Sequence, residues 1–77
     1  MVLHVRIIPD ISSKGYYVKV DEIPFVHTQG NTIRQCIKNS YEAIELALED
    51  PNDRKKLGIP QKVKVEFIIE GSTINVG

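Results

Sequence analysis

The stretch GYYVKVDEIPFVHTQGNTIRQCIKNSYEAIELALED, residues 15–50, predicts an α+β fold, because its apolar pattern changes from that of strands to that of a helix. Tyr16 to Val20 alternates between apolar and polar faces, which predicts a strand. Pro24 then interrupts the pattern, since proline cannot donate to a sheet ladder. Phe25 to Gln29 is expected to form a short third strand at an edge of the sheet.

A helix is predicted from Thr32 to Glu49. Thr32 and Gln35 fit a capping box, in which threonine accepts from a backbone amide and glutamine reaches back to the cap. Pro51 stops the pattern. The apolar positions that recur at helical spacing are Ile33, Ile37, Tyr41, Ile44 and Leu48. They predict one apolar face, which needs a sheet to cover it.

The flanking segments supply the rest of that sheet. Val2 to Ile8 and Lys62 to Glu70 alternate clearly and are predicted to be strands. Pro9 to Gly15 has the composition of a hairpin loop, and Asn52 to Gln61 that of a charged loop. Thr73 to Val76 is expected to form a short terminal strand.

The predicted fold is therefore α+β with the order βββαβ, as a single domain over residues 1–77. One helix packs on a small antiparallel-type sheet, because each layer has one apolar face to bury. The other face of the sheet stays open and mixes apolar with polar groups, which makes it a candidate interface. Its members are Val2, His4, Arg6, Ile8, Tyr17, Lys19, Lys64, Glu66 and Ile68.

Composition narrows the possible functions. The chain has 77 residues, with ten basic and ten acidic side chains and a net charge of zero. A domain that binds nucleic acid on its own usually carries a basic excess. We expect a cytoplasmic protein, because the sequence shows neither a membrane-length apolar run nor a charged leader. A chain this short often gains stability by association, so we also expect a dimer or tetramer.

No combination of residues suggests catalysis or metal binding. His27 lacks a nearby nucleophile motif or an orienting acid, and His4 is interpreted as a sheet-surface residue. Cys36, beside the apolar stripe, is interpreted as a packing residue. Asp21 and Glu22 are adjacent on a predicted strand, so they point to opposite faces and cannot easily share a metal. We predict no catalytic, cofactor or metal site.

Charged side chains suggest binding instead. Arg54-Lys55-Lys56 is interpreted mainly as solvated charge, with phosphate contact as the alternative. The polar face of the helix opposes the helix dipole, which favours acids at the start and bases at the end. Its members are Arg34, Lys38, Glu42, Glu45 and Glu49, with Asp50 following. Either this face is merely solvated, or its acidic half is kept for a basic partner.

Several short motifs in order resemble the HicB-like antitoxins, over about half of the chain. These motifs are Gly15-Tyr16-Tyr17-Val18, Asp21-Glu22-Ile23-Pro24, Thr28-Gln29-Gly30-Asn31-Thr32, then Asn39 and Glu42-Ala43-Ile44. Phe25 departs from the family, which has glycine after the proline. Arg34-Gln35-Cys36 also departs, where the family helix starts with Glu-Glu-Ala.

The resemblance implies a degraded ribonuclease-H-like fold without catalytic carboxylates. It also implies a protein that binds and inhibits a HicA-type toxin, a small mRNA-cleaving ribonuclease. The C-terminal DNA-binding segment of many family members is not seen before Gly77. Partner contacts are predicted from Tyr17, Phe25, His27, Glu42, Glu45 and Glu49.

Three functions remain open from sequence. The first is a non-catalytic antitoxin-like module, or an orphan homo-oligomeric version of it. The second is a free-standing nucleic-acid-binding domain, which the zero net charge disfavours. The third is a small hydrolase that uses His27 with an unidentified acid.

Overall fold

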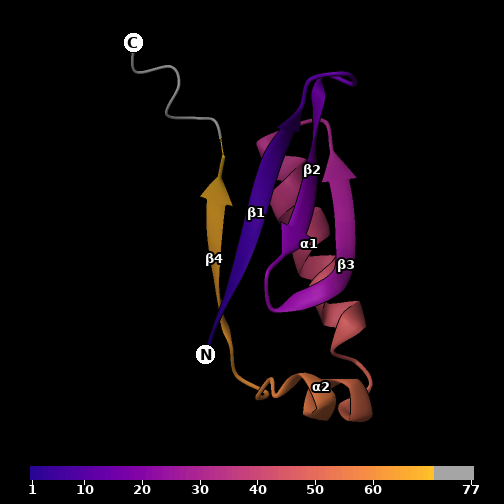
Figure 1. Cartoon of the computed structure of the whole chain (residues 1–77), viewed down its shortest axis with the longest axis vertical. Coiled ribbons are helices and arrows are strands. Elements are labelled where there is room, and N and C mark those ends of the chain that lie inside the picture. The colour runs from indigo at the N-terminus through magenta and orange to yellow at the C-terminus, as the bar shows by residue number, and fades with distance from the viewer. Residues whose placement is uncertain (71–77) are drawn as a thin grey trace.

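A four-stranded mixed sheet in the order β3-β2-β1-β4 is covered on one face by a helix (Figure 1). The computed structural model describes residues 1–70, so the strand predicted at Thr73 to Val76 lies outside the described residues. The elements are β1 (Val2–Asp10), β2 (Gly15–Val20), β3 (Ile23–Gly30), α1 (Ile33–Ala47), α2 (Pro51–Leu57) and β4 (Lys64–Ile69). The predicted α+β order βββαβ is confirmed, with one short helix added.

The first three strands form an antiparallel meander. In β1 and β2, Ile7 lies opposite Val18, so both side chains point to the helix-covered face. β2 pairs with β3, and the register shifts between Lys19 and Val20, where β3 bends. β3 is longer than predicted, because Pro24 lies near its start, where a proline is tolerated in an edge strand.

β4 pairs with β1 in parallel, so the predicted antiparallel-type sheet is wrong on this point. The reason lies in the path of the chain. β1 and β3 run in the same direction, and α1 then carries the chain back to the end of the sheet where β1 begins (Figure 1). A strand that starts from that end must run parallel to β1, which is the usual outcome of a helical crossover.

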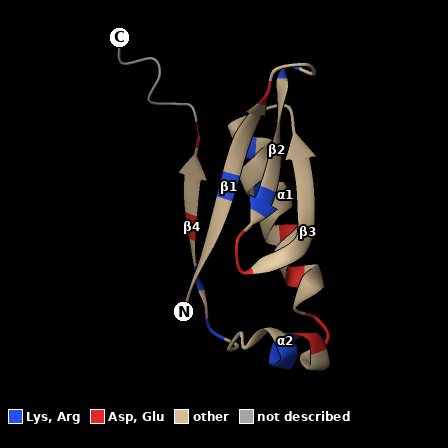
Figure 2. Ribbon diagram, viewed as in Figure 1, with Lys and Arg blue, Asp and Glu red and all other residues tan. Residues whose placement is uncertain are grey.

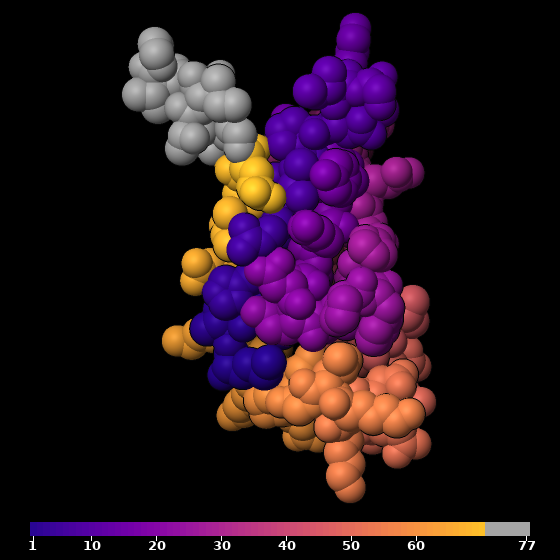
Figure 3. Space-filling view, in the orientation of Figure 1, coloured from indigo at the N-terminus to yellow at the C-terminus, as the bar shows by residue number. Residues whose placement is uncertain are grey.

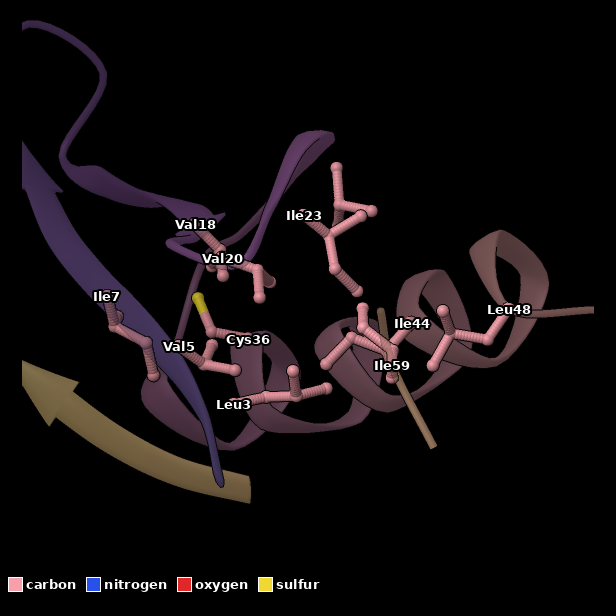
Figure 4. Packing of buried hydrophobic residues seen from close by; sticks show 11 residues of the cluster. Leu3, Val5, Ile7, Val18, Val20, Ile23, Cys36, Ile44, Leu48 and Ile59 are labelled. Atoms are coloured by element: carbon pink, nitrogen blue, oxygen red, sulfur yellow. The ribbon is translucent and has the colours of Figure 1, made fainter. Parts of the chain in front are cut away.

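The core lies between the sheet and α1 (Figure 4). Leu3, Val5 and Ile7 of β1 are fully buried, because this strand has a neighbour on each side. The other buried apolar residues are Val18, Val20, Ile23, Val26, Cys36, Ile44, Leu48 and Ile59.

α1 is rotated relative to the predicted apolar stripe. Cys36 and Ser40 are fully buried, whereas Ile37 is only half-buried and Tyr41 is 51% exposed. Small side chains allow the helix to approach the sheet closely, and the Ser40 hydroxyl is satisfied by donating to the carbonyl oxygen of Cys36 at 2.5 Å. The Tyr41 ring instead packs edge-on against Phe67 of β4, with ring centroids 5.6 Å apart.

The predicted charged loop at Asn52 to Gln61 contains a helix, α2. The sequence holds the necessary signals: Asp50 caps the amide of Asn52, Pro51 takes the first helical position, and Gly58 ends the helix in the left-handed conformation at φ 69°. Arg54 is therefore not simply solvated. Its Nη2 donates to the carbonyl oxygen of Leu48 at 2.6 Å and closes the end of α1.

Candidate functional site

The junction of β3 with α1 contains two of the HicB-like motifs, residues 28–32 and Asn39. α1 packs mainly on β3, which is an edge strand of the sheet. The polar groups of the junction are used to hold the two elements together. Asn39 Nδ2 donates to the carbonyl oxygen of Gln29 at 2.7 Å, and the Asn31 amide donates to Gln35 Oε1 at 2.8 Å. The Thr32 hydroxyl accepts from the Gln35 amide at 3.1 Å, which completes the predicted cap.

Two glycines of the junction stand where an added side chain would be tightly crowded. A Cβ on Gly30 would lie 3.0 Å from both the backbone nitrogen and the Sγ of Cys36. A Cβ on Gly15 would lie 3.0 Å from the carbonyl oxygen of Gly30. The motif glycines thus set the close approach of β2, β3 and α1, so their role in this structure is packing.

Beside this junction lies an exposed apolar hollow, which we call the β3 hollow. It has a volume of about 250 Å³ and is lined by Phe25, Val26, His27, Ala43, Leu46 and Ala47. Phe25 is 57% exposed and Leu46 is 72% exposed. Large apolar side chains that gather on a surface commonly mark an interaction site, whereas isolated ones are ordinary.

The exposed face of α1 next to the hollow is acidic. Arg34 and Lys38 lie in its first half, and Glu42, Glu45 and Glu49 follow in and just beyond its second half (Figure 2). All five of these side chains are exposed. Glu45 and Glu49 also line a second hollow with Tyr41 and Arg54, on the side of α1 that faces β4. Negative charge therefore extends across the helix from the β3 hollow.

A comparison with known proteins identifies the family. A UPF0150 protein of Thermotoga maritima is 32% identical over 59 residues, which cover 77% of this chain and 76% of the relative. The chain belongs to the UPF0150 family. No family model matches the sequence. No solved structure matches it either.

The outer face of the sheet in this UPF0150 family member, which is turned toward the viewer in Figure 3, carries two ion pairs. Glu22 accepts from the His4 backbone amide at 2.7 Å and lies 2.5 Å from His4 Nδ1. Arg6 Nε donates to the two Asp21 oxygens at 2.9 and 3.0 Å. Both pairs join the β2–β3 turn to β1.

The protonation of these groups follows from the pairing. The hydrogen bond with Glu22 raises the pKa of His4, and the Arg6 guanidinium lowers the pKa of Asp21. Burial opposes ionisation of Glu22, but the hydrogen bonds from His4 outweigh it and lower the pKa of that carboxyl. Asp21 and Glu22 each have a separate cationic partner. Among residues 1–70, no three His, Cys, Asp or Glu side chains gather as a metal site.

The remaining candidates for chemistry have structural surroundings. Cys36 is fully buried, and this burial raises the pKa of its thiol, so the reactive thiolate is disfavoured. His27 is exposed, and in the described part of the chain no carboxylate lies at ion-pair distance from it. No helix within residues 1–70 has the length and apolar character needed to cross a membrane.

The structure brings some of the predicted partner-binding residues together and separates others. Phe25 and His27 share the β3 hollow. His27 also lies next to Tyr17, which is 46% exposed on the outer face of the sheet. Glu42 lies one helical turn before Leu46, and Glu45 and Glu49 border the other hollow.

Sequence reasoning missed Leu46, Ala43 and Ala47 as members of the site. The sequence does single out Leu46, because it is a large apolar residue outside the predicted apolar stripe of the helix.

Proposed function

We propose that this UPF0150 family member is a HicB-like, antitoxin-like protein that acts in the cytoplasm without catalysis. It binds and inhibits a HicA-type mRNA-cleaving toxin. The proposal combines the HicB-like motifs, of which residues 28–32 and Asn39 are built into the β3–α1 junction, with a surface suited to binding. An RNA-cleaving protein must hold a polyanion, so it presents basic side chains that an acidic surface complements.

One observation carries the proposal: exposed apolar and acidic side chains lie together beside the edge strand β3. Phe25 and Leu46 supply the apolar part, and Glu42 the neighbouring acid. Among the described residues that line the hollow, His27 is the one titratable group, and neither an acid nor a nucleophile is among them. This composition suits the recognition of a protein and offers no evident catalytic machinery.

The proposal is tested by co-expression of this protein with a HicA-type toxin. We expect growth arrest by the toxin alone and recovery when the wild-type protein is supplied. The triple variant Glu42→Lys, Glu45→Lys, Glu49→Lys should restore growth poorly, because it reverses the charge offered to the toxin. Lys55→Glu, Lys56→Glu on α2 is the matched charge-reversal control and should restore growth fully. Continued arrest with soluble wild-type protein present would contradict the proposal.

A second candidate is an orphan homo-oligomeric binding module, which the outer face of the sheet favours. This face is open in Figure 3, with Val2 36% and Tyr17 46% exposed and Ile8 and Ile68 half-buried. Self-association as a dimer or tetramer through this face is compatible with toxin binding elsewhere. Light scattering on the wild type and on Tyr17→Lys tests it, since a dimer that uses this face should dissociate in the variant.

A further inference from the structure

The two edges of the sheet differ in their protection. β4 carries Lys64 and Glu66, which is the usual way in which proteins discourage pairing at an edge strand. β3 has eight residues and no Asp, Glu, Lys or Arg among them. Its edge therefore lacks the charges that would keep another strand away, and Pro24 limits pairing near its start.

The open part of this edge lies directly beside the β3 hollow. Toward the end of the strand, Asn39 already covers the carbonyl oxygen of Gln29. The stretch from Phe25 to Thr28 remains, and Phe25, Val26 and His27 are themselves lining residues of the hollow. An added strand places alternate side chains on one face of the sheet, so one of them would fall over the hollow.

Charge distinguishes between the possible occupants. A two-fold axis beside the hollow would place Leu46 of one copy near Leu46 of the other. The same axis would bring Glu42 of both α1 helices together, because Glu42 lies one helical turn before Leu46. Like charges in one interface oppose association, whereas lysine or arginine side chains on a different partner would complement them.

We propose that the free edge of β3 accepts an edge strand of a basic protein partner. The strand pairs with β3 from Phe25 to Thr28, inserts an apolar side chain against Phe25 and Leu46, and places basic side chains near Glu42. This proposal rests on the proposed function, in which the toxin supplies that strand. It specifies the surface and the mode of binding, which the proposed function leaves open.

The test is the affinity of the HicA-type toxin for the wild type and two variants, measured by calorimetry. Leu46→Arg removes an apolar side chain from the hollow and adds a positive charge that would repel a basic partner. We therefore expect it to weaken binding by about tenfold or more. Ile11→Arg is the matched control, because Ile11 is 95% exposed in the β1–β2 turn, away from the hollow. It should change the affinity by less than about twofold. Equal melting temperatures show that both variants fold.

Amide hydrogen exchange on the complex supplies the second measurement. We expect protection to increase at Phe25–Thr28 when the toxin binds, because strand addition engages backbone amides there. Toxin binding that leaves Leu46→Arg as tight as the wild type, with no new protection in β3, would overturn the strand proposal alone. Failure of the wild type to bind the toxin would overturn the proposed function and this proposal with it. A wild-type dimer that Leu46→Arg converts to monomer would assign the edge to a second copy and also overturn the proposal.

Discussion

Replacement of Gly30 by alanine tests the packing of the β3–α1 junction. The new Cβ would lie 3.0 Å from the backbone nitrogen and Sγ of Cys36, and 3.1 Å from Cβ of Gln35. Two of these three neighbours are a backbone atom and the first atom of a side chain, which cannot swing aside, so α1 must move away from β3. Overpacking of this kind typically costs about 1–3 kcal/mol.

A smaller effect acts in the opposite direction. Alanine restricts the unfolded chain more than glycine does, which stabilises by about 0.4–1 kcal/mol where the backbone conformation is permitted. We therefore expect Gly30→Ala to lower the free energy of unfolding by about 1–2 kcal/mol. Urea titration followed by circular dichroism measures this difference, repeated at two protein concentrations so that any association is detected.

A matched glycine and a second-site change make the result interpretable. Gly58→Ala also loses a glycine, but no atom lies within 4 Å of the added Cβ, so its cost comes only from the positive φ of 69°. Cys36→Ala in the Gly30→Ala background removes the Sγ contact and should recover part of the loss. A Gly30→Ala protein as stable as the wild type, or more stable, would refute the close packing described for this junction.

Three further predictions concern stability and use the same urea titration. Ile44→Ala should lower the free energy of unfolding by about 2–5 kcal/mol because Ile44 is buried, and Ile37→Ala should lower it clearly less because Ile37 is half-buried. The reverse order would mean that α1 faces the sheet with its predicted apolar stripe. The His4–Glu22 pair should stabilise the fold most between pH 4.5 and 6.5, the ordinary pKa values of the two groups. Because the pKa of His4 is raised, its stabilising contribution is lost as pH rises through that raised pKa. Because the pKa of Glu22 is lowered, its stabilising contribution is lost as pH falls through that lowered pKa. His4→Gln should remove the loss that follows as pH rises above about 6.5, and an unchanged pH profile would contradict the pairing. Arg54→Ala should cost about 1 kcal/mol by freeing the carbonyl at the end of α1, and Arg54→Lys should recover little of it; a neutral Arg54→Ala would show that the contact does not stabilise.

The order of elements could be predicted because its signals are local. Alternation in β1 and β2, the cap at Thr32 and the stop at Pro51 all act over a few residues, and each element lies close to its predicted position. The direction of β4 was missed because it depends on the end of the sheet to which α1 returns the chain. That is a property of the whole path and leaves no mark in the alternating pattern of Lys62 to Glu70.

The rotation of α1 was missed for a different reason. A stripe of large apolar residues predicts which face is buried only when the opposing surface has room for them. Here Gly30 brings the helix close, so the small side chains of Cys36 and Ser40 take the central positions. Ile37 and Tyr41 lie at the margin of the helix–sheet contact while Ile44 stays buried, and Leu46 is left exposed beside β3.

Helix α2 was missed although its cap, its first-position proline and its terminal glycine were all visible in sequence. Its charged composition, centred on Arg54 to Lys56, outweighed these signals. For the candidate site, sequence identified Phe25 and the acids of α1, but only the fold placed Phe25 against Leu46 on a free edge.

We propose above all that this protein silences an RNA-cleaving toxin by binding it. RNA cleavage by a purified HicA-type toxin, titrated with increasing amounts of the purified protein, tests this proposal. We expect cleavage to fall in proportion to the protein added and to stop at a fixed molar ratio, and we expect Leu46→Arg to require a clear excess. Cleavage that continues unchanged at a large excess of wild-type protein would contradict the proposal.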